Sequence, residues 1–264
     1  KTAIVGLLPG SAAFLIEHVI FAIVFVAMYP AVLLAFAKSI VKKVDGRGLN
    51  VEGLLALLNS LDQIVGCKVD RFASHAVNIQ GLSKETAFCQ LTQPMLQIAE
   101  ITRGVSELFN ALRTDKKATL IRVVLAAFES RKIIAIPIHY PQDEPVHASI
   151  EVLNSRSSAI MTAARTKKIV VIQSIEKEMK KTIGRRFVKS SSEEDNTGSL
   201  ICYPVVHKGE NEVPFVISIH CDQVGYFKEE FSELYEHSLQ RFALRLRLEY
   251  SLLTIKERIC ETNI

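Results

Sequence analysis

The first pattern along the chain is a long run of apolar residues. Positions 19–37 read VIFAIVFVAMYPAVLLAFA and contain no charged side chain, and Ile40 and Val41 extend the run. About 20 apolar residues in a helix cross a hydrocarbon core of roughly 30 Å. The pattern therefore predicts a membrane-spanning helix over about 19–41. Pro30 is acceptable within it, because membrane helices tolerate proline better than soluble helices do.

A second apolar stretch, 3–16, precedes this run and is interrupted by Pro9 and Gly10. It is short for a full crossing, so we expect a re-entrant or interfacial segment, or one half of a helical hairpin. A cleaved secretory signal is the rival interpretation, but no small-residue cleavage site supports it. Basic residues follow the long run: Lys38, Lys42, Lys43 and Arg47. By the positive-inside rule, we expect 1–43 to anchor the protein in the cell inner membrane, with the remainder in the cytoplasm.

Beyond a turn-rich hinge at 44–50, the apolar pattern is first helical. Apolar residues recur every three or four positions over 51–65 and again over 84–112. Pro94 falls inside the second of these segments and is expected to kink or interrupt it. The same spacing returns near the end of the chain and predicts a closing helix over 228–258.

Between these helices the pattern changes to runs rich in β-branched residues. The predicted strands are 119–128, 132–139, 169–172, 200–206 and 214–221. The first two read as a hairpin, and a helical stretch is expected near 150–165. A polar loop with nothing to bury is expected at 189–198. Helices packed on an antiparallel sheet give an α+β domain over 51–260.

Two local phrases fit this order of elements. SAIMTAARTKKIVVIQSIEKE (158–178) and GSLICYPVVHKGENEVPFVISIHC (198–221) resemble the helix-then-strand and strand–turn–strand segments of the GAF domain family. The resemblance implies a cytosolic sensory or regulatory domain that binds a small molecule between sheet and helices, often as a dimer. The family's cyclic-nucleotide signature, bilin-attachment context and clustered cysteines are missing here. The ligand and any cofactor therefore stay unknown.

Strand alternation places several polar side chains on one face of the predicted sheet. Ser218 and His220 share a face, while Arg122 interrupts one strand of the hairpin and His139 ends the other. We expect these four side chains, with Tyr203, to line a pocket suited to an anionic or polar ligand. The alternative is that this face is partly solvated and the residues merely cover it.

The start of the helix near position 158 is a second candidate place for an anion. Arg156 and Ser158 lie there, and backbone N–H groups at a helix N-terminus favour negative charge, although such serines are commonly caps. A basic run follows the next predicted strand: Lys177, Lys180, Lys181, Arg185 and Arg186. Such a run is usually a solvated face, but in a membrane-tethered protein it could also touch anionic lipid.

Signatures of catalysis and metal binding are missing from the sequence. It contains no GxSxG, P-loop or HExxH motif and no acidic metal cluster. The five cysteines lack ligand-like spacing and read as reduced thiols. A net charge of +4, with bases and acids interleaved, gives no nucleic-acid surface. We therefore expect no catalytic residues, no metal site, no enzymatic activity and no nucleic-acid partner.

The closing helix carries an apolar stripe that predicts a homo-oligomer. Leu239, Phe242, Leu246 and Leu253 recur at spacings near those of a coiled-coil seam. We expect them at a dimer interface that transmits a signal between the domain and the anchor. The alternative is that the stripe packs only on the chain's own sheet.

Together these patterns favour a membrane-anchored cytosolic GAF-like sensor. It would bind a small ligand or a partner protein and signal through dimerisation or the membrane segment, without enzymatic output of its own. A membrane effector of a defence or toxin type, whose soluble domain oligomerises and whose hydrophobic segments perturb the bilayer, is the first alternative. The second is a scaffold subunit of a membrane complex, with an empty or filled GAF pocket.

Overall fold

The computed structural model describes residues 51–76, 81–112, 120–190, 192, 194–207 and 212–261. The predicted anchor at 1–43 and the predicted hinge at 44–50 lie outside the described residues. Within the described ranges, no helix combines the length and apolarity that a bilayer crossing requires. The chain divides into two units, Lys1–Leu54 and Leu55–Ile264, and the second carries the sheet and the cavity described below.

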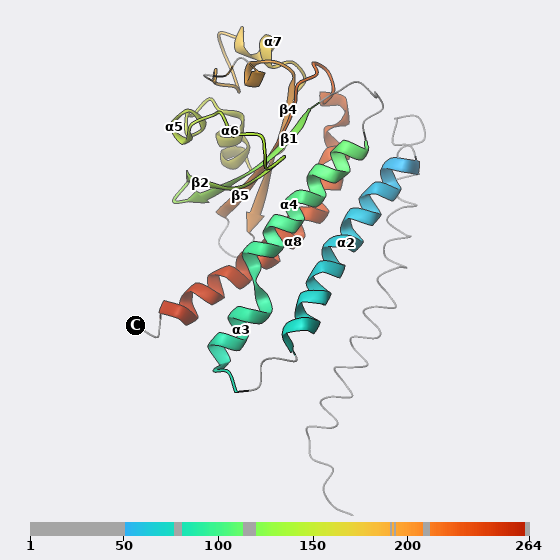
Figure 1. Ribbon diagram of the computed structural model, residues 1–264. Coiled ribbons are helices and arrows are strands. Elements are labelled where there is room, and N and C mark those ends of the chain that lie inside the picture. The colour runs from blue at the N-terminus through green and yellow to red at the C-terminus, as the bar shows by residue number, and fades with distance from the viewer. Residues whose placement is uncertain are drawn as a thin grey trace, which may run out of the picture. The chain divides into compact units, whose positions relative to one another are not determined.

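A five-stranded antiparallel sheet forms the centre of this second unit, in the order β2-β1-β5-β4-β3 (Figure 1). The strands are β1 (Ile121–Glu129), β2 (Lys132–Tyr140), β3 (Val170–Ile172), β4 (Ser199–His207) and β5 (Glu212–Cys221). The predicted hairpin is present, because Glu129 pairs with Lys132 across a two-residue turn. Ser130 and Arg131 in this turn both adopt positive φ, which matches the twist of the flanking strands. The predicted α+β class is confirmed.

Helices cover both faces of the sheet (Figure 1). One face carries α4 (Pro94–Ala111) and α8 (Ser232–Glu261), and the other carries α5 (Ile150–Leu153) and α6 (Ala159–Thr166). The remaining helical segments are α2 (Val51–Ala76), α3 (Lys84–Thr92), α7 (Ile175–Met179), η1 (Glu194–Asn196) and η2 (Glu229–Phe231). Pro94 interrupts the helix predicted over 84–112, as expected: Gln93 adopts a left-handed φ of 36° and Pro94 begins α4.

Strand alternation gives each face of the sheet its own part of the core. Toward α4 and α8 the strands bury Val123, Leu125, Ile201, Ile217 and Ile219. The opposite face packs on α6 through a second cluster: Ala126, Ile160, Ala163, Val170, Ile172, Leu200, Cys202 and Val216. An antiparallel sheet buried on both faces needs apolar residues at consecutive strand positions, which explains the near-continuous apolar runs in the sequence.

The apolar stripe of the closing helix belongs to this core. Leu239, Phe242 and Leu246 are 0% exposed, and the Phe242 ring lies 3.4 Å from the position that a Cβ on Gly104 of α4 would occupy. The prediction that these three side chains form a dimer interface is therefore wrong: the stripe packs within its own chain. Leu253 is half-buried.

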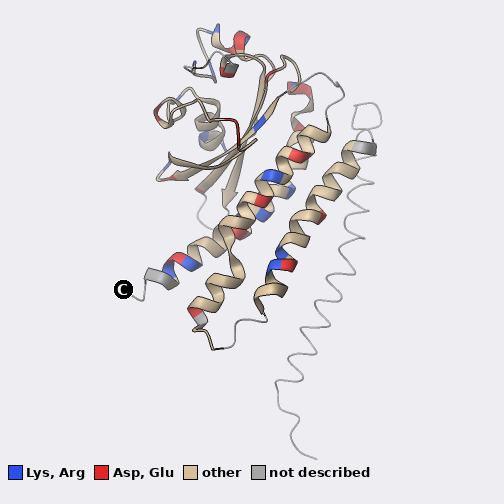
Figure 2. Ribbon diagram, viewed as in Figure 1, with Lys and Arg blue, Asp and Glu red and all other residues tan. Residues whose placement is uncertain are grey.

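The α2 helix joins this bundle through polar contacts as well as apolar ones. Charged side chains recur along α2, α4 and α8 (Figure 2), and Lys68 of α2 forms an ion pair with the buried Glu249 of α8. The buried side chain of Gln97 in α4 donates a 2.8 Å hydrogen bond to the Ile64 carbonyl of α2. These contacts attach α2 to the two helices that cover the sheet.

Candidate ligand cavity

A cavity of about 110 Å³ lies over the face of the sheet that α5 and α6 cover. His139 from β2, Val124 from β1 and Ser218 from β5 form one row of its floor, because Val124 pairs with both neighbours. Arg122 and His220 face each other two positions further along the same strands. Four side chains that the sequence assigned to one pocket thus line one cavity. Their role in ligand binding stays a prediction.

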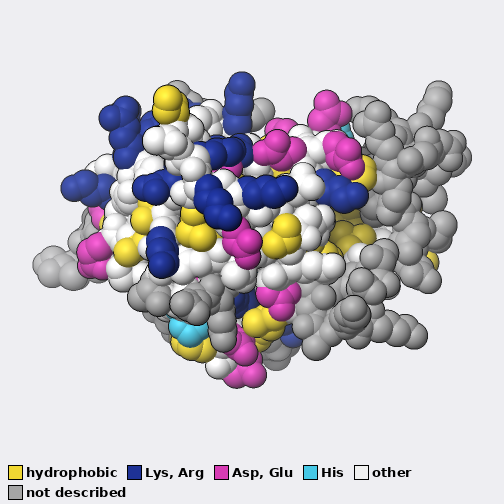
Figure 3. All heavy atoms as spheres, turned by 90° about the horizontal axis from the view of Figure 1, so that it is seen from above, with side chains coloured by type: hydrophobic (Ala, Val, Ile, Leu, Met, Phe, Trp, Pro, Cys, Tyr) yellow, Lys and Arg dark blue, Asp and Glu magenta, His cyan; other side chains and the backbone are white. Residues whose placement is uncertain are grey.

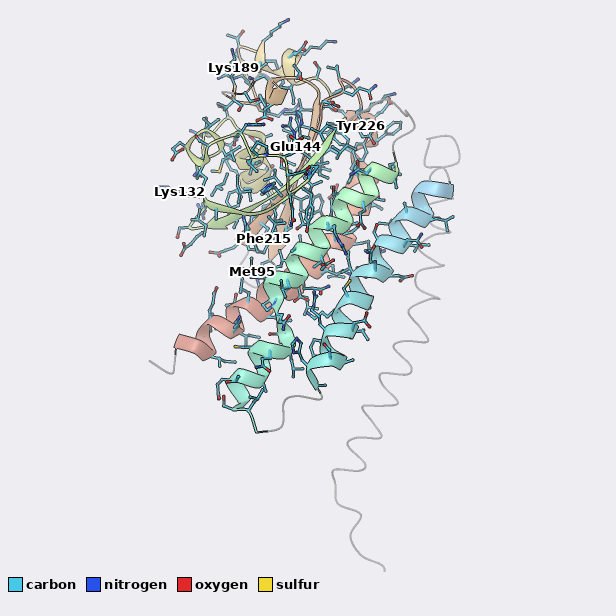
Figure 4. The ribbon with its side chains drawn as sticks, viewed as in Figure 1. Met95, Lys132, Glu144, Lys189, Phe215 and Tyr226 are labelled. Carbon is cyan, nitrogen blue, oxygen red and sulfur yellow. The ribbon has the colours of Figure 1, made fainter. Side chains whose placement is uncertain are left out.

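Apolar side chains form most of the remaining wall. Val152 and Leu153 come from α5, Ile160 from α6 and Leu200 from β4. Glu144, labelled in Figure 4, lies in the connection between β2 and α5 and adds a carboxylate to the lining. A cavity of roughly 150 Å³ holds a benzene-sized molecule of six non-hydrogen atoms, so this smaller one encloses a group of about four.

Arg122 is the buried charge of the cavity. The residue is the second of β1 and is only 8% exposed. Its Nη2 lies 3.0 Å from Asp195 Oδ1 and 3.3 Å from His220 Nδ1. Its Nη1 is also buried and has no hydrogen-bond partner among the described residues. Since buried polar groups are nearly always paired, this nitrogen marks a donor that the described part of the chain leaves unused.

His220 is held as the neutral imidazole beside this guanidinium. Its Nε2 lies 3.0 Å from the Thr197 carbonyl oxygen, which can only accept a hydrogen bond. Nε2 therefore carries the proton, and Nδ1 accepts from Arg122. Burial lowers the pKa of His220, and the positive charge of Arg122 lowers it further. The cavity consequently holds one buried cation rather than two.

Asp195 reaches the cavity from the segment at 189–198, which was expected to be a polar loop with nothing to bury. Ser190 and Asn196 in this segment are buried. Asn196 Oδ1 accepts from the Ser190 backbone N–H at 2.8 Å, and Nδ2 donates to the Ser190 carbonyl at 3.0 Å. The prediction that 189–198 has nothing to bury is wrong, because short polar side chains satisfy the local backbone and allow the segment to pack.

Ser158 also lines the cavity, but its hydroxyl is already engaged. Its Oγ accepts from the Met161 backbone N–H at 3.1 Å and donates to the Leu153 carbonyl at 2.5 Å, so it acts as the N-cap of α6. The first residues of α6, Ala159 and Ile160, line the same cavity. The positive end of the α6 dipole is therefore directed at this space, where it favours a negative charge.

Tyr203 and Arg156 lie elsewhere. Tyr203 pairs with Ile217 and so points to the opposite face of the sheet, where it lines a separate hollow with Glu236 and Arg247. Burial raises the pKa of its hydroxyl. Arg156 is exposed and lines a third hollow, beside the β1–β2 turn. The structure does not bring these two residues into the cavity.

Four polar residues of the lining that lie outside the strands were not found from the sequence: Glu144, His147, Ser190 and Asp195. All of them lie in connections, where no periodicity indicates the direction of a side chain. The one available signal was the density of polar residues at 189–198, which is equally typical of a solvated loop. In the part of the chain that the structure describes, no three His, Cys, Asp or Glu side chains cluster closely enough to hold a metal ion.

No protein-family model and no curated protein matches the sequence. Among solved structures, the chain is similar to a GAF domain at 15% identity and a TM-score of 0.45, over 76% of this chain and 92% of that one. It is also similar to the GAF domain of an Acinetobacter phosphoenolpyruvate-protein phosphotransferase (14% identity, TM-score 0.42, 79% and 98% coverage). A third similar structure is free methionine-R-sulfoxide reductase from Neisseria meningitidis with its substrate (13%, 0.44, 63% and 86%). The similarity is to the GAF-like fold, which the sequence also indicated.

Proposed function

We propose that this domain is a GAF-like regulatory module that binds a small anionic ligand, such as a short-chain carboxylate, in the cavity over the sheet. The observation that carries the proposal is the buried Nη1 of Arg122, which lacks a hydrogen-bond partner among the described residues. A buried donor without an acceptor costs free energy. A carboxylate oxygen of the ligand would satisfy it with a charge-assisted hydrogen bond.

Three further features support an anion with an apolar body. The N-terminus of α6 borders the cavity and adds a positive partial charge. Much of the remaining wall is aliphatic, including Val152, Leu153 and Leu200. The volume of about 110 Å³ limits the buried part of the ligand to a few non-hydrogen atoms. Asp195 already neutralises part of the Arg122 charge, so we expect moderate affinity.

The module is proposed to act without catalysis of its own, as a cytoplasmic domain held at the inner membrane by the apolar run at 19–41. Support for the anchor is that run and the basic residues after it. The signal would pass to a second copy of the chain, to a partner protein or to the membrane segment. Exposed apolar residues on the outer faces of α2 and α8 favour such a contact: Val65, Val69, Phe72, Leu244 and Leu248.

The proposal is tested by thermal unfolding of the purified full chain in the presence of matched probes. Butyrate and isovalerate should raise the melting temperature, because a ligand that binds only the folded state stabilises it by an amount that grows with the ratio of its concentration to its Kd. The corresponding amides have the same shape without the charge, and should not raise it. Arg122→Gln should abolish the carboxylate effect, whereas Arg165→Gln, at an exposed position outside the cavity, should retain it. An equal effect of acids and amides would refute an anion site.

A further inference from the structure

An exposed aliphatic side chain stands among basic residues in the segment that follows α7. Ile183 is 91% exposed, more than any other large hydrophobic side chain in the described part of the chain. The next residue, Gly184, has a φ of +69° and turns the backbone at this point. We call residues 177–189 the basic loop. Its charged residues are Lys177, Glu178, Lys180, Lys181, Arg185, Arg186 and Lys189.

The base of the basic loop is fixed by ion pairs with its one acid. Glu178 is buried, and its carboxylate accepts from Lys181 Nζ at 2.6 Å and from the Arg186 backbone N–H at 2.9 Å. Arg186 also bonds Glu229, at the start of η2, at 2.9 Å. The loop therefore has a defined shape, although its tip is solvated.

Four basic side chains of the loop stay exposed, and none of them forms an ion pair with the described residues: Lys177, Lys180, Arg185 and Lys189. Figure 3 looks onto the end of the molecule that carries α7 and shows Lys and Arg side chains gathered across this face. An exposed aliphatic side chain surrounded by basic residues is unfavourable in water, because apolar area stays exposed and like charges lie close together.

We propose that the basic loop docks on an anionic bilayer surface, with Ile183 inserted at the boundary between headgroups and acyl chains. Lys and Arg near a membrane surface are attracted to anionic lipid, and an apolar side chain among them gains by leaving water. Nucleic acid fits less well, because Ile183 offers no ring on which a base could stack. This proposal uses no residue of the ligand-binding proposal as its support and can fail independently of it.

A membrane contact here would also reach the cavity. Phe187, Val188 and Ser190 follow the tip of the loop and line the cavity wall. Docking at Ile183 and occupancy at Arg122 would then act on one continuous segment. Binding is reciprocal: if ligand occupancy changes the affinity of the loop for the membrane, membrane docking changes the affinity for the ligand by the same factor.

Limited trypsin digestion of the full chain tests the docking. The protein is reconstituted into phosphatidylcholine vesicles with or without phosphatidylserine. Mass spectrometry then measures cleavage after Arg185 relative to cleavage after Arg131, an exposed residue in the β1–β2 turn. We expect phosphatidylserine to lower this ratio several-fold and high salt to restore it, because salt screens charges at a surface. The internal ratio cancels differences in protein orientation and in trypsin activity.

The matched variants are Ile183→Asp and Ile134→Asp, the latter on the exposed side of the edge strand β2. Both should keep the wild-type melting temperature, because both side chains face solvent. Only Ile183→Asp should lose the protection by phosphatidylserine. The proposal is overturned if the cleavage ratio is the same on both vesicles, or if Ile183→Asp is protected as well as wild type. Protection by added single-stranded RNA with none by phosphatidylserine would also reject it and indicate a nucleic-acid surface.

Discussion

Asp195 Oδ1 lies 3.0 Å from Nη2 of Arg122, so a connecting segment supplies the counter-charge for a buried cation at the start of β1. The pairing is one-sided: Nη2 also contacts His220, whereas Nη1 has no partner among the described residues. Arg122 is thus held in position by one end of its guanidinium while the other end stays available. This division of the guanidinium underlies the proposed anion site.

Asp195→Asn should increase the affinity for a carboxylate probe. The substitution removes the negative charge that competes with the ligand for Arg122, while an amide oxygen can still accept from Nη2. The free protein should be less stable, because a partly buried ion pair is lost. The measurement is the isovalerate-induced rise in melting temperature, which should be larger than in wild type. A smaller rise would show that Asp195 assists the ligand rather than competing with it.

Stability should fall on mild acidification because of His220. Burial and the Arg122 charge lower its pKa in the folded state, so the fold favours the neutral ring. This contribution is fully present above the ordinary histidine pKa of about 6.5 and is lost as pH falls through the lower folded pKa. Urea unfolding of wild type and His220→Gln should therefore give a stability difference that shrinks as the pH is lowered below about 6.5. A difference independent of pH would contradict the neutral assignment.

Glu249 should act in the opposite direction. Burial raises its pKa, although Lys68 opposes the shift, and its Oε2 has no partner among the described residues. A raised carboxyl pKa means that stability present below the unfolded value of about 4.3 is lost as pH rises through the folded pKa. Glu249→Gln should accordingly gain stability relative to wild type as the pH rises above about 4.3, measured by chemical denaturation. Glu257→Gln, at an exposed position on the same helix, should show no such trend.

Gly198 should not accept a side chain. Its φ is +88°, and a Cβ there would lie 2.0 Å from the Cys221 carbonyl oxygen and 2.8 Å from the Asp222 carbonyl carbon. Both contacts are with backbone that pairs in the sheet or follows it directly, so Gly198→Ala should cost about 3 kcal/mol or more in the free energy of unfolding. Gly66→Ala in α2 meets nothing within 4 Å and should instead stabilise by about 1 kcal/mol. Equal effects of the two substitutions would contradict this explanation.

The sequence predicted those features of the site that follow from the alternation of side chains along a strand. Alternation along β1, β2 and β5 was enough to bring Arg122, His139, Ser218 and His220 together, because each faces the same side as its cross-strand neighbour. The same alternation shows why the prediction for Tyr203 was wrong. Leu200 and Cys202 face α6, so Tyr203, the next residue, faces the opposite side of the sheet.

Features that depend on how the elements pack in the tertiary structure were not predictable in this way. The stripe of Leu239, Phe242 and Leu246 suits a coiled-coil seam and a sheet-covering helix equally well, and only the fold decides between them. Asp195 lies in a polar segment whose composition is typical of a solvated loop, yet it supplies the ion pair of the cavity. The ion pair between this loop carboxylate and the guanidinium on β1 depends on where the loop lies relative to the sheet, and no local sequence pattern encodes that position.

Ligand-observed ¹⁹F NMR with 4,4,4-trifluorobutyrate tests the anion site most directly, because it detects binding of a short carboxylate without assuming the natural ligand. With the full chain, the fluorine signal should broaden, and excess isovalerate should restore it. The broadening should disappear in Arg122→Gln and persist in Arg165→Gln, whose side chain is exposed and outside the cavity. Equal broadening with wild type and Arg122→Gln would contradict the assignment of Arg122 as the anion-binding residue.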